Sequence, residues 1–564
     1  MSDDVTSVDR GSLARSSSAM AVGTIASKVT GVLRDVAAAA ALGFYIVADA
    51  FSLGNSLPTI VYILLIGGAL NAVFVPQLVR RMKEDPDGGV GYADRLLTAA
   101  GLALIVLSVL AVIGAPWIVD LYTPADYPAG AYDLAVAFAR LCLPQMIFYG
   151  IYAMLTQVLN ARGTFGLPMF APIANNIVAI GTFLLFIFVA GTSAAADGQL
   201  SSNQVLILGV GTTLGVAVQA LILVPVLRRS GYHWRPRFDW RDSGLGHASR
   251  LAAWTLGLVL VNQLAYLVIT RLTVQANVNA AAAGTVAAGL TTYQKAHLIF
   301  ILPHSVVTVS IVAATLPLLS RLAHAGDRNK VGQEIGRMTR IVVALVLPVA
   351  VLLAVEGPNI ALLLFGYGAA TPEQATLLGR VVAVFMIGLV PFSVVYICLR
   401  GFYALEDTRT PFWIAVVFSA LWLLLAFPLF RLASAGGQQI GSLALAYGIG
   451  YWLTLIIAWL LLRRRLGSLD SRATFTTVAK LLLAAGFAAA VMVGTQVVAE
   501  PELERLLGSA VVLGHGLDGR LVLLITVLVM GIIGALCYAL AARLLRAPEV
   551  MDAWSLVRRR LVRT

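Results

Sequence analysis

Charged residues are scarce in this sequence, which has 564 residues of which only 12% are charged and 59% are hydrophobic. A soluble domain is typically about one quarter charged. Several apolar runs exceed the ~20 residues needed to cross a hydrocarbon core of ~30 Å. The runs are continuous rather than alternating, which argues against a membrane β-barrel. The composition therefore excludes a soluble globular protein and predicts an all-α polytopic membrane protein.

Residues that carry metal, disulfide or nucleotide chemistry are equally few. The three cysteines all fall in apolar runs, so no disulfide framework is expected, and the six histidines show no metal-ligand spacing. No phosphate-binding loop of the Walker type is present, which argues against ATP hydrolysis. We therefore expect no cofactor and no ATP hydrolysis by this chain.

Hydropathy predicts fourteen membrane-spanning helices. The first span is followed at once by the second and has no small-residue cleavage site, so no cleaved signal peptide is expected. The predicted spans cover residues 20–47, 50–79, 96–119, 134–160, 168–190, 204–227, 251–275, 286–320, 341–355, 376–399, 411–430, 441–462, 481–498 and 521–542.

The net charge of +12 has its source in the topology of these spans rather than in nucleic-acid binding. Of the 40 Lys and Arg residues, 31 lie in the two tails and in every second loop, and three lie in the opposite loops. Loops rich in Lys and Arg face the cytoplasm. This pattern predicts a multi-pass membrane protein with both termini in the cytoplasm.

An internal repeat divides the spans into two lobes. The segment "NAVFVPQLVRR" closes the second span and "VAATLPLLSRL" closes the eighth. The offset is 241 residues from Pro76 to Pro317 and 243 residues from Pro168 to Pro411. A near-constant offset that covers six spans predicts two parallel six-helix lobes, as in one class of transporters. Chance recurrence of Pro and Arg at the ends of membrane helices is the alternative explanation.

The predicted organisation has six parts. They are a cytoplasmic tail (1–18), an N-lobe (19–230), a cytoplasmic linker (231–250), a C-lobe (251–466), two extra C-terminal helices (467–546) and a basic cytoplasmic tail (547–564).

A few charged residues fall within the spans, where a charge at the bilayer centre costs about 2.5–3.5 kcal/mol on insertion scales. Such residues normally face a bundle interior or a hydrated cavity. Lys28 and Asp35 share one face of the first span, with Gly31 between them leaving room for a head group or a close helix. Arg34 is next to Asp35, and the two could instead form a purely structural pair.

The C-lobe supplies matching cations. At the repeat offset, Arg271 falls near Thr30 and Lys295 falls near Asn55. Lys28, Arg34, Arg271 and Lys295 therefore come from the leading helices of both lobes and predict a cationic central cavity. Clustered Arg and Lys suit a pyrophosphate, because Arg matches phosphate oxygens bidentately.

Other polar residues in the spans have simpler interpretations. Lys295 could mark the end of a span, within the polar cluster of Tyr293, Gln294 and His297. Asn262 is a further candidate for substrate binding, with an interhelical hydrogen bond as the alternative. Arg140 and Arg380 lie near span ends, where an arginine typically snorkels to the interface.

Several motifs together resemble the MurJ (MviN) family of lipid II flippases in the MOP superfamily, and the pattern is most similar to actinobacterial members. The motifs are "SKVTGVLRDVAAAAALG", "ADAFSLGNSLP", "GGALNAVFVPQL", "LNARGTFGLPMFAPIANN", "LPHSVVTVSIVAATLPLLS" and "GFYALEDTRTPF". The resemblance implies two six-helix lobes around a central cavity, with an apolar groove at the two extra helices for the lipid tail. It implies no enzyme activity but export of undecaprenyl-pyrophosphate-linked peptidoglycan precursor from the inner to the outer leaflet.

Only some of the residues typical of the family are found at the matching positions of this chain. The first-span pattern is matched by Ser27, Gly31, Arg34 and Asp35, whereas Lys28 replaces an Arg. The family's Asp-Ala-Phe is matched from Asp49, which the resemblance makes a candidate site residue. Many members have charged residues where this chain has Tyr62, Ile63, Gly67, His297 and Leu298. We hypothesise that Arg271 and Lys295 restore the missing cations.

The resemblance also implies partners: lipid II itself, the surrounding membrane lipids, and proteins of cell-wall synthesis and division. Three alternatives stay open on sequence grounds. They are a flippase for another polyprenyl-linked saccharide, a MATE-like multidrug exporter, and a scaffold for wall-synthesis enzymes. A basic cavity disfavours the second, because exporters of cationic drugs need acidic cavities.

Overall fold

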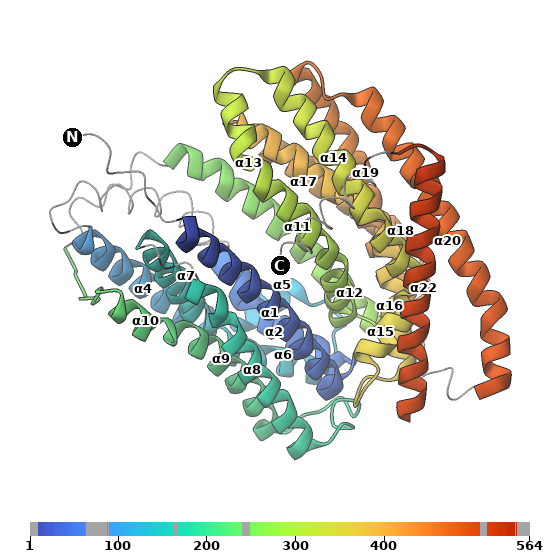
Figure 1. Cartoon of the computed structure of the whole chain (residues 1–564). Helices are drawn as coiled ribbons and strands as arrows, with labels where there is room; N and C mark the ends of the chain where they lie inside the picture. Colours follow the sequence, from blue (N-terminus) through green and yellow to red (C-terminus); the bar gives the residue numbers. More distant parts are fainter. Residues whose placement is uncertain are drawn as a thin grey trace, which may run out of the picture. The chain divides into compact units, whose positions relative to one another are not determined.

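The computed structural model describes residues 10–63, 87, 89–162, 164, 166–239, 249–507, 516–547 and 549, and no strand occurs among them. It divides into two compact units (Figure 1). The first contains residues 1–267 with 368–370, and the second contains 268–367 with 371–564. Residues 1–9 and 550–564 of the predicted tails, the middle of the predicted linker, and Pro76 and Gly67 near the end of the second span lie outside the described residues.

The first unit is built from the helices of the predicted N-lobe. The closely packed pairs are α1 on α8, α8 on α9, α2 on α6 and α4 on α7. An aromatic core joins Phe51 to Phe138 and Phe183, with ring centroids 5.2 and 5.9 Å apart in edge-on geometry. The helices are α1 (Arg10–Leu42), α2 (Ile46–Tyr62), α4 (Val90–Ile113), α5 (Ala115–Tyr122), α6 (Ala129–Cys142), α7 (Gln145–Ala161), α8 (Gly166–Ala190), α9 (Ser202–Leu221) and α10 (Leu223–Arg229).

The second unit holds the predicted C-lobe and the two extra helices. Its first helix, α11, crosses the division between the units. The elements are α11 (Ser249–Ala282), α12 (Leu290–Pro303), a π-helical turn η3 (His304–Thr308), α13 (Val309–His324), α14 (Arg328–Val355), α15 (Gly357–Phe365), α16 (Pro372–Phe385), a 3₁₀ turn η4 (Met386–Gly388), α17 (Leu389–Ala404), α18 (Arg409–Leu432), α19 (Gly437–Leu466), α20 (Ser471–Leu507) and α22 (Gly516–Leu544).

Three pairs of helices agree with the repeat predicted from the sequence. The short helices α5 and α15 begin at residues 115 and 357, α6 and α16 at 129 and 372, and α8 and α18 at 166 and 409. Both lobes also break one span at the same place. Pro144, which has no backbone N–H to continue a helix, lies between α6 and α7, and η4 lies between α16 and α17.

Twelve helices among the described residues are long and apolar enough to cross a membrane. The first two predicted spans are not among them. The described part of α1 carries Lys28, Arg34 and Asp35, and α2 has only 17 residues before the described part of the chain is interrupted. The count of fourteen therefore stays a prediction, whereas the all-helical, polytopic architecture is confirmed.

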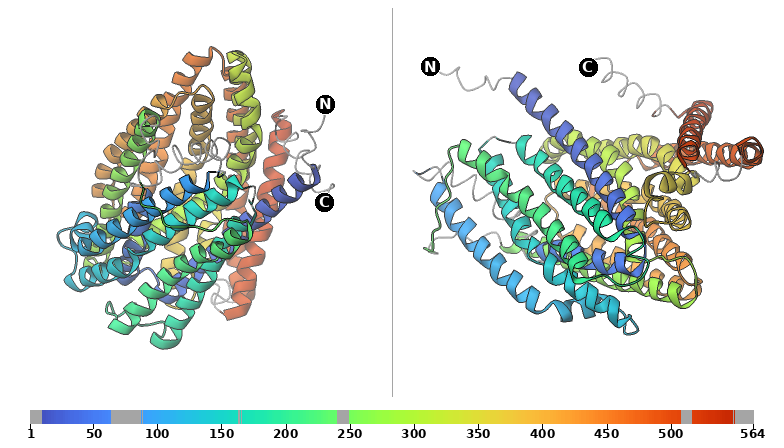
Figure 2. Two further views of the ribbon diagram at one scale, coloured as in Figure 1. Left: turned by 90° about the vertical axis from the view of Figure 1, so that its left-hand side faces the viewer. Right: turned by 90° about the horizontal axis from the view of Figure 1, so that it is seen from below.

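The two extra C-terminal helices form a hairpin that is bonded to the rest of the second unit. α20 and α22 pack against each other, and α20 packs on α14 (Figure 2). Gln496 of α20 donates a hydrogen bond of 2.6 Å to Glu356, which is fully buried at the start of α15. Arg520 of α22 donates to the carbonyl oxygens of Leu362 and Gly366 at the other end of α15. Both ends of α15 are thus held by the hairpin.

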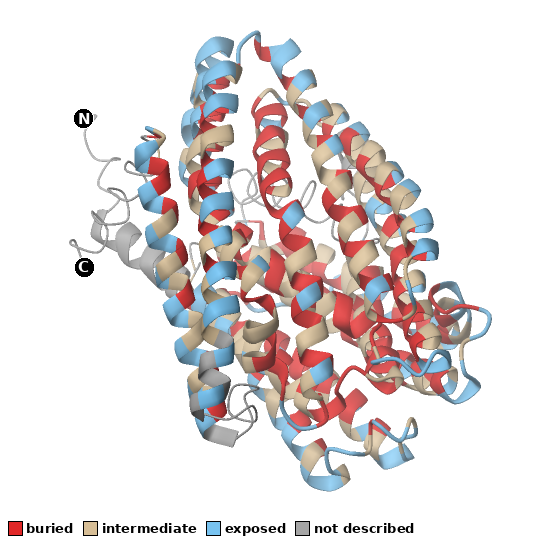
Figure 3. Cartoon of the chain, turned by 90° about the vertical axis from the view of Figure 1, so that its right-hand side faces the viewer, coloured by how far each residue is buried: buried red, intermediate tan, exposed pale blue. Residues whose placement is uncertain are grey.

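Exposed positions follow the helices over much of their length (Figure 3), and many of them are large apolar residues. Phe188 on α8 is 88% exposed, Val498 on α20 is 73% exposed and Leu424 on α18 is 70% exposed. In water, an exposed apolar surface of this extent would be unfavourable. Contact with lipid acyl chains removes that cost, in agreement with the twelve candidate spans.

Candidate functional site

The charged face of α1 packs against α8. Gly31 lies on this face, and a Cβ built on it would be 3.7 Å from the amide nitrogen of Asn176 on α8. Of the two possibilities that the sequence offered for Gly31, the structure shows the close helix. Asn176 of α8 therefore lies directly over Gly31, at a distance of ordinary van der Waals contact.

Asn176 bridges the two helices through three hydrogen bonds. Its amide nitrogen donates to the hydroxyl of Thr30 at 2.9 Å and to the carbonyl oxygen of Ser27 at 3.2 Å. Its amide oxygen accepts from Nη1 of Arg34 at 3.3 Å. Asn176 is 5% exposed, so the amide is held in a nearly closed environment. The tandem asparagines at the end of the motif "LPMFAPIANN" were the only sequence signal for this contact.

Arg34 also pairs with its neighbour Asp35. Nη2 of Arg34 lies 3.3 Å from Oδ1 of Asp35, and the side chains are 36% and 8% exposed. The structural pair that the sequence left open is therefore formed. It buries the carboxylate but leaves about a third of the arginine accessible, so Arg34 is held in place by Asn176 and Asp35 while still presenting a cationic surface. Lys28, half-buried, lies on the same helix two turns before Asp35.

Sequence reasoning missed a second polar group inside the first unit. Gln145, at the start of α7, donates to Oδ1 of Asn55 on α2 at 3.1 Å and to the hydroxyl of Thr213 on α9 at 3.2 Å. Thr213 in turn donates to the carbonyl oxygen of Leu141 at 2.8 Å. These hydrogen bonds join α2, α7 and α9 at the break between α6 and α7. In the sequence, the only indication of this group was that Asn55, Gln145 and Thr213 are polar residues within three predicted apolar spans.

The remaining candidates have separate positions. Asp49 is 1% exposed and lies in the first turn of α2, where the helix dipole stabilises a carboxylate. Asn262 and Arg271 are exposed on α11, and Lys295 is half-buried on α12. The structure thus gathers Lys28, Gly31, Arg34 and Asp35 on α1. That Arg271, Lys295 and Asn262 join them around one cavity, with Asp49, stays a prediction.

His297 lies in a packed aromatic cluster of the second unit. Its ring is 5.4 to 5.7 Å from those of Phe300, Phe385 and Tyr447, and its Nε2 is 3.4 Å from the Tyr447 hydroxyl. Further aromatic rings from α17, α18 and α19 continue the cluster through Phe392, Phe418, Trp422 and Tyr451. Where the resembling family has a charged pair, this chain therefore has an aromatic wall.

A family model described as "Lipid II flippase MurJ" matches residues 38–507, which is most of the chain. This chain belongs to the MurJ lipid II flippase family. The resemblance drawn from the sequence motifs is thereby confirmed. MurJ-family proteins are transporters rather than enzymes, in agreement with the predicted lack of enzyme activity, and the chain is a multi-pass protein of the inner membrane.

Curated relatives extend the match to MurJ proteins over most of their length. A probable lipid II flippase MurJ of Rhizobium meliloti is 29% identical over 443 residues, covering 77% of this chain and 79% of the relative. One from Rhizobium tropici is 28% identical over 495 residues, covering 86% and 87%. A lipid II flippase MurJ of Burkholderia cenocepacia is 27% identical over 448 residues, covering 78% and 82%.

Solved structures show the same fold. A lipid II flippase MurJ in an inward closed conformation matches with a TM-score of 0.70 at 18% identity, covering 93% of this chain and 98% of that structure. An inward-facing multidrug transporter of the MATE family, also in the MOP superfamily, matches with a TM-score of 0.61 at 17% identity, covering 79% and 96%. The MurJ fold therefore accounts for nearly the whole chain, and the MATE transporter shares much of this fold.

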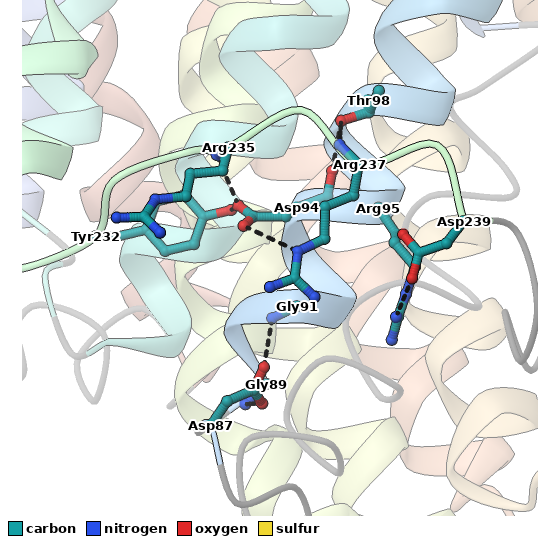
Figure 4. Close-up of polar contacts among 10 residues, drawn as sticks. All are labelled: Asp87, Gly89, Gly91, Asp94, Arg95, Thr98, Tyr232, Arg235, Arg237 and Asp239. Carbon is teal, nitrogen blue, oxygen red and sulfur yellow. Dashed lines mark hydrogen bonds and ion pairs between the residues drawn. The ribbon is translucent and has the colours of Figure 1, made fainter.

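In this MurJ-family chain, the segment that follows α10 is fastened to the start of α4 (Figure 4). Asp94, 1% exposed, accepts a 2.6 Å hydrogen bond from the Tyr232 hydroxyl and a 3.2 Å bond from the Arg235 backbone N–H. Nε of Arg237 is 4.0 Å from the same carboxylate, and its backbone N–H donates to Thr98 at 3.1 Å. Burial and the hydrogen bond to Asp94 raise the pKa of Tyr232, so this phenol stays a donor.

Two further carboxylates accept hydrogen bonds near the start of α4. Asp87 accepts from the backbone N–H groups of Gly89 and Gly91 at 3.0 and 2.8 Å, which caps the start of α4. Asp239 accepts from Arg95 at 3.1 Å, and this hydrogen bond lowers the pKa of Asp239. We call residues 232–239 the strap. Its sequence is basic and aromatic, and its hydrogen bonds to Asp94, Arg95 and Thr98 attach it to α4.

The motif "GFYALEDTRTPF" also has a structural explanation. Oδ1 of Asp407 accepts the backbone N–H of Thr410 at 2.9 Å, and Oδ2 accepts the Thr410 hydroxyl at 2.6 Å. Burial opposes ionisation of Asp407, but these bonds and the nearby Arg465 prevail and lower its pKa. Asp407 therefore caps the first turn of α18, and its carboxylate is accounted for without a ligand.

Proposed function

We propose that this chain moves lipid II, the undecaprenyl-pyrophosphate-linked peptidoglycan precursor, from the inner to the outer leaflet by alternating access of its two lobes. The observation that carries the proposal is the arrangement on α1 in a chain of the MurJ family. Arg34 is oriented by Asn176 and Asp35, yet about a third of its side chain is accessible. A fixed, accessible guanidinium suits the recognition of phosphate oxygens.

The proposed mechanism assigns different parts of lipid II to different parts of the chain. Lys28, Arg34, Arg271 and Lys295 bind the pyrophosphate of the head group, with Asn262 and Asp49 bordering the site, whereas Gly31 lies in contact with α8. The undecaprenyl tail lies along the apolar surface of α20 and α22, where Val498 and Leu536 are 73% and 65% exposed. The long apolar tail thus stays in contact with apolar residues while the head group crosses.

Membrane potential or an ion gradient is the proposed energy source. Each elementary charge that crosses the membrane contributes about 2.3 kcal/mol per 100 mV. An anionic head group moving outward with a compensating cation would therefore respond to the potential. The proposed orientation has both termini in the cytoplasm, because the Lys-rich and Arg-rich loops lie on that side. Contacts with proteins of cell-wall synthesis and division are a further expectation.

The basic character of the site favours this substrate over the drugs of the MATE exporters. The likeness to MATE transporters reflects the fold, whereas a site containing Lys28 and Arg34 favours an anion over a cationic drug. Another polyprenyl-linked saccharide would present a similar phosphate and is the remaining alternative. It differs from lipid II in its sugar and peptide groups.

Leaflet-specific detection of lipid II tests the proposal. Cells depleted of the chain should accumulate lipid II in the inner leaflet, and the wild-type chain should restore its export. Variants Arg34→Gln and Arg271→Gln should fail to restore export. The matched control is Arg431→Gln, an exposed arginine at the end of α18. Normal export in depleted cells, or full activity of the double variant Arg34→Gln/Arg271→Gln, would refute the proposed function.

A further inference from the structure

Among the described residues, two pockets that the proposed transport site does not use lie one in each unit. In the first unit a pocket of about 630 Å³ lies between α6 and the start of α9, and Arg140 lines it. In the second unit a pocket of about 610 Å³ lies between α16 and the start of α19, and Arg380 lines it. These are the two arginines for which the sequence suggested snorkelling.

The two pockets occupy equivalent positions in the internal repeat. With α6 aligned on α16 at an offset of 243 residues, Leu134, Ala137 and Leu141 correspond to Leu377, Arg380 and Val384, which line the second pocket. With α9 aligned on α19 at an offset of 235, Gly198, Gln199, Leu200, Ser202 and Leu206 correspond to Ala433, Ser434, Ala435, Gly437 and Gly441, which also line it. Equivalent residues of the repeat therefore form the same pocket in both units.

The arginines are retained in both pockets although their positions differ slightly. Arg380 corresponds to Ala137, and Arg140 lies three residues further along α6, which is just under one helical turn. Neither guanidinium makes a hydrogen bond or ion pair with another residue in the described part of the chain, and both side chains are exposed. Two unpaired cations in matching hollows indicate a shared anionic ligand.

The second pocket offers a further donor. Gln438 lines it, and its amide oxygen accepts a 3.4 Å hydrogen bond from the backbone of Ser434. Its amide nitrogen has no partner among the residues that the structure describes. Arg380 lies eight residues after the start of α16, so it is about 12 Å along the helix from that end. The positive end of the α19 dipole faces the same pocket.

The rest of the lining is largely apolar. In the second pocket it includes Val286, Leu377, Val381, Val384 and Leu445, and no acidic residue is among the lining residues. In the first pocket Asp133 also lines the wall and offsets part of the charge of Arg140. An apolar wall beside an unpaired cation fits an amphiphile with an anionic head group better than a free anion, because free phosphate would gain nothing from the apolar side.

We propose that these two pockets bind the phosphate-bearing head group of an anionic phospholipid, with Arg380 or Arg140 on the phosphate and the first part of an acyl chain against the apolar wall. The pocket in the second unit binds more tightly, since it has no acidic residue. Both pockets lie at the helix ends that the proposed orientation places on the outer side, so the choice of leaflet, but not the binding itself, rests on the proposed function.

Counting bound lipids tests this proposal. The purified full-length chain is titrated with phosphatidylglycerol in detergent, and native mass spectrometry measures how many lipids stay bound. Losing a charge-assisted hydrogen bond should make binding to the second pocket about tenfold weaker in Arg380→Gln. Arg140→Gln should have a smaller effect, and Arg380→Lys should keep most of the binding because it keeps the charge.

Controls separate the pockets from general attraction to a basic protein. Arg431→Gln removes an exposed arginine that lines neither pocket and should bind phosphatidylglycerol as the wild type does. Zwitterionic phosphatidylcholine should bind more weakly than phosphatidylglycerol. Equal binding of the two lipids, or unchanged binding by Arg140→Gln/Arg380→Gln with a wild-type melting temperature, shows that the arginines only snorkel and overturns the proposal. The measurement needs no transport, so that result would leave the proposed flippase function standing.

Discussion

Replacing Asn176 by Ala should release Arg34 from its fixed position. The substitution removes the two hydrogen bonds that Asn176 donates to α1 and the one that it accepts from Arg34. Hydrogen bonds between membrane helices average about 0.6 kcal/mol each in double-mutant cycles. Three such bonds predict a loss of about 2 kcal/mol of folding free energy. Export of lipid II should fall as well, because the guanidinium is no longer oriented.

A double-mutant cycle with Arg34→Gln measures the part of this effect that passes through the arginine. Unfolding of the purified chain gives the stabilities, and leaflet-specific lipid II detection gives the export activities. We expect a coupling of about 0.6 to 1.7 kcal/mol in stability. We also expect that Asn176→Ala adds little to the export defect of Arg34→Gln.

The neighbouring Asn175 supplies a matched control. Its side chain makes no hydrogen bond within the described residues, so Asn175→Ala should lose much less stability and activity than Asn176→Ala. Strictly additive effects of Asn176→Ala and Arg34→Gln, in both stability and export, would refute the idea that Asn176 positions Arg34.

Three further predictions concern the helix ends and helix contacts. Asp94→Asn weakens the hydrogen bonds that the buried Asp94 side chain accepts, at a cost of about 2 kcal/mol in folding free energy. The backbone amides of the strap should then exchange hydrogen faster, and unchanged protection from exchange would contradict this. Asp407→Ala removes a cap and should cost about 1 kcal/mol near neutral pH. The pKa of Asp407 is lower in the folded state than its ordinary value of 3.8, so the stability difference between Asp407→Ala and the wild type should disappear as the pH falls from 3.8 through the folded-state pKa. A stability difference that persists at lower pH would argue against the cap. Gly379→Ala places a Cβ against the carbonyl oxygen of Gly357 and should cost about 1–3 kcal/mol in a thermal unfolding assay, whereas Gly486→Ala, with open space around it, should not.

The helices, their repeat and the charged face of α1 could be predicted because these features are local. Hydropathy is read from a continuous run, and the spacing of Lys28, Gly31 and Asp35 fixes a helix face without knowledge of any partner. The offset of 243 residues between Pro168 and Pro411 equals the offset between the starts of α8 and α18. Periodic and repeated features of the fold can thus be predicted directly from the sequence.

The partners of these residues could not be predicted, because contacts between distant segments leave no local pattern. Asn176 is 142 residues away from Arg34, and Asp94 is 138 residues away from Tyr232. The hollows beside Arg140 and Arg380 were equally hidden, since each depends on a second helix that approaches from elsewhere in the chain. Only the three-dimensional structure shows that the two arginines are related.

The attachment of α15 at both ends has a mechanical consequence for the C-terminal hairpin. Gln496 and Arg520 join α20 and α22 to a short helix that starts directly after α14, and the Tyr538 hydroxyl adds a 3.1 Å bond from α22 to Ala344 on α14. If α14 tilts during transport, the hairpin of α20 and α22 would therefore move with it as a rigid body. A hydrocarbon chain resting on the hairpin would then travel with this half of the transporter instead of sliding past it.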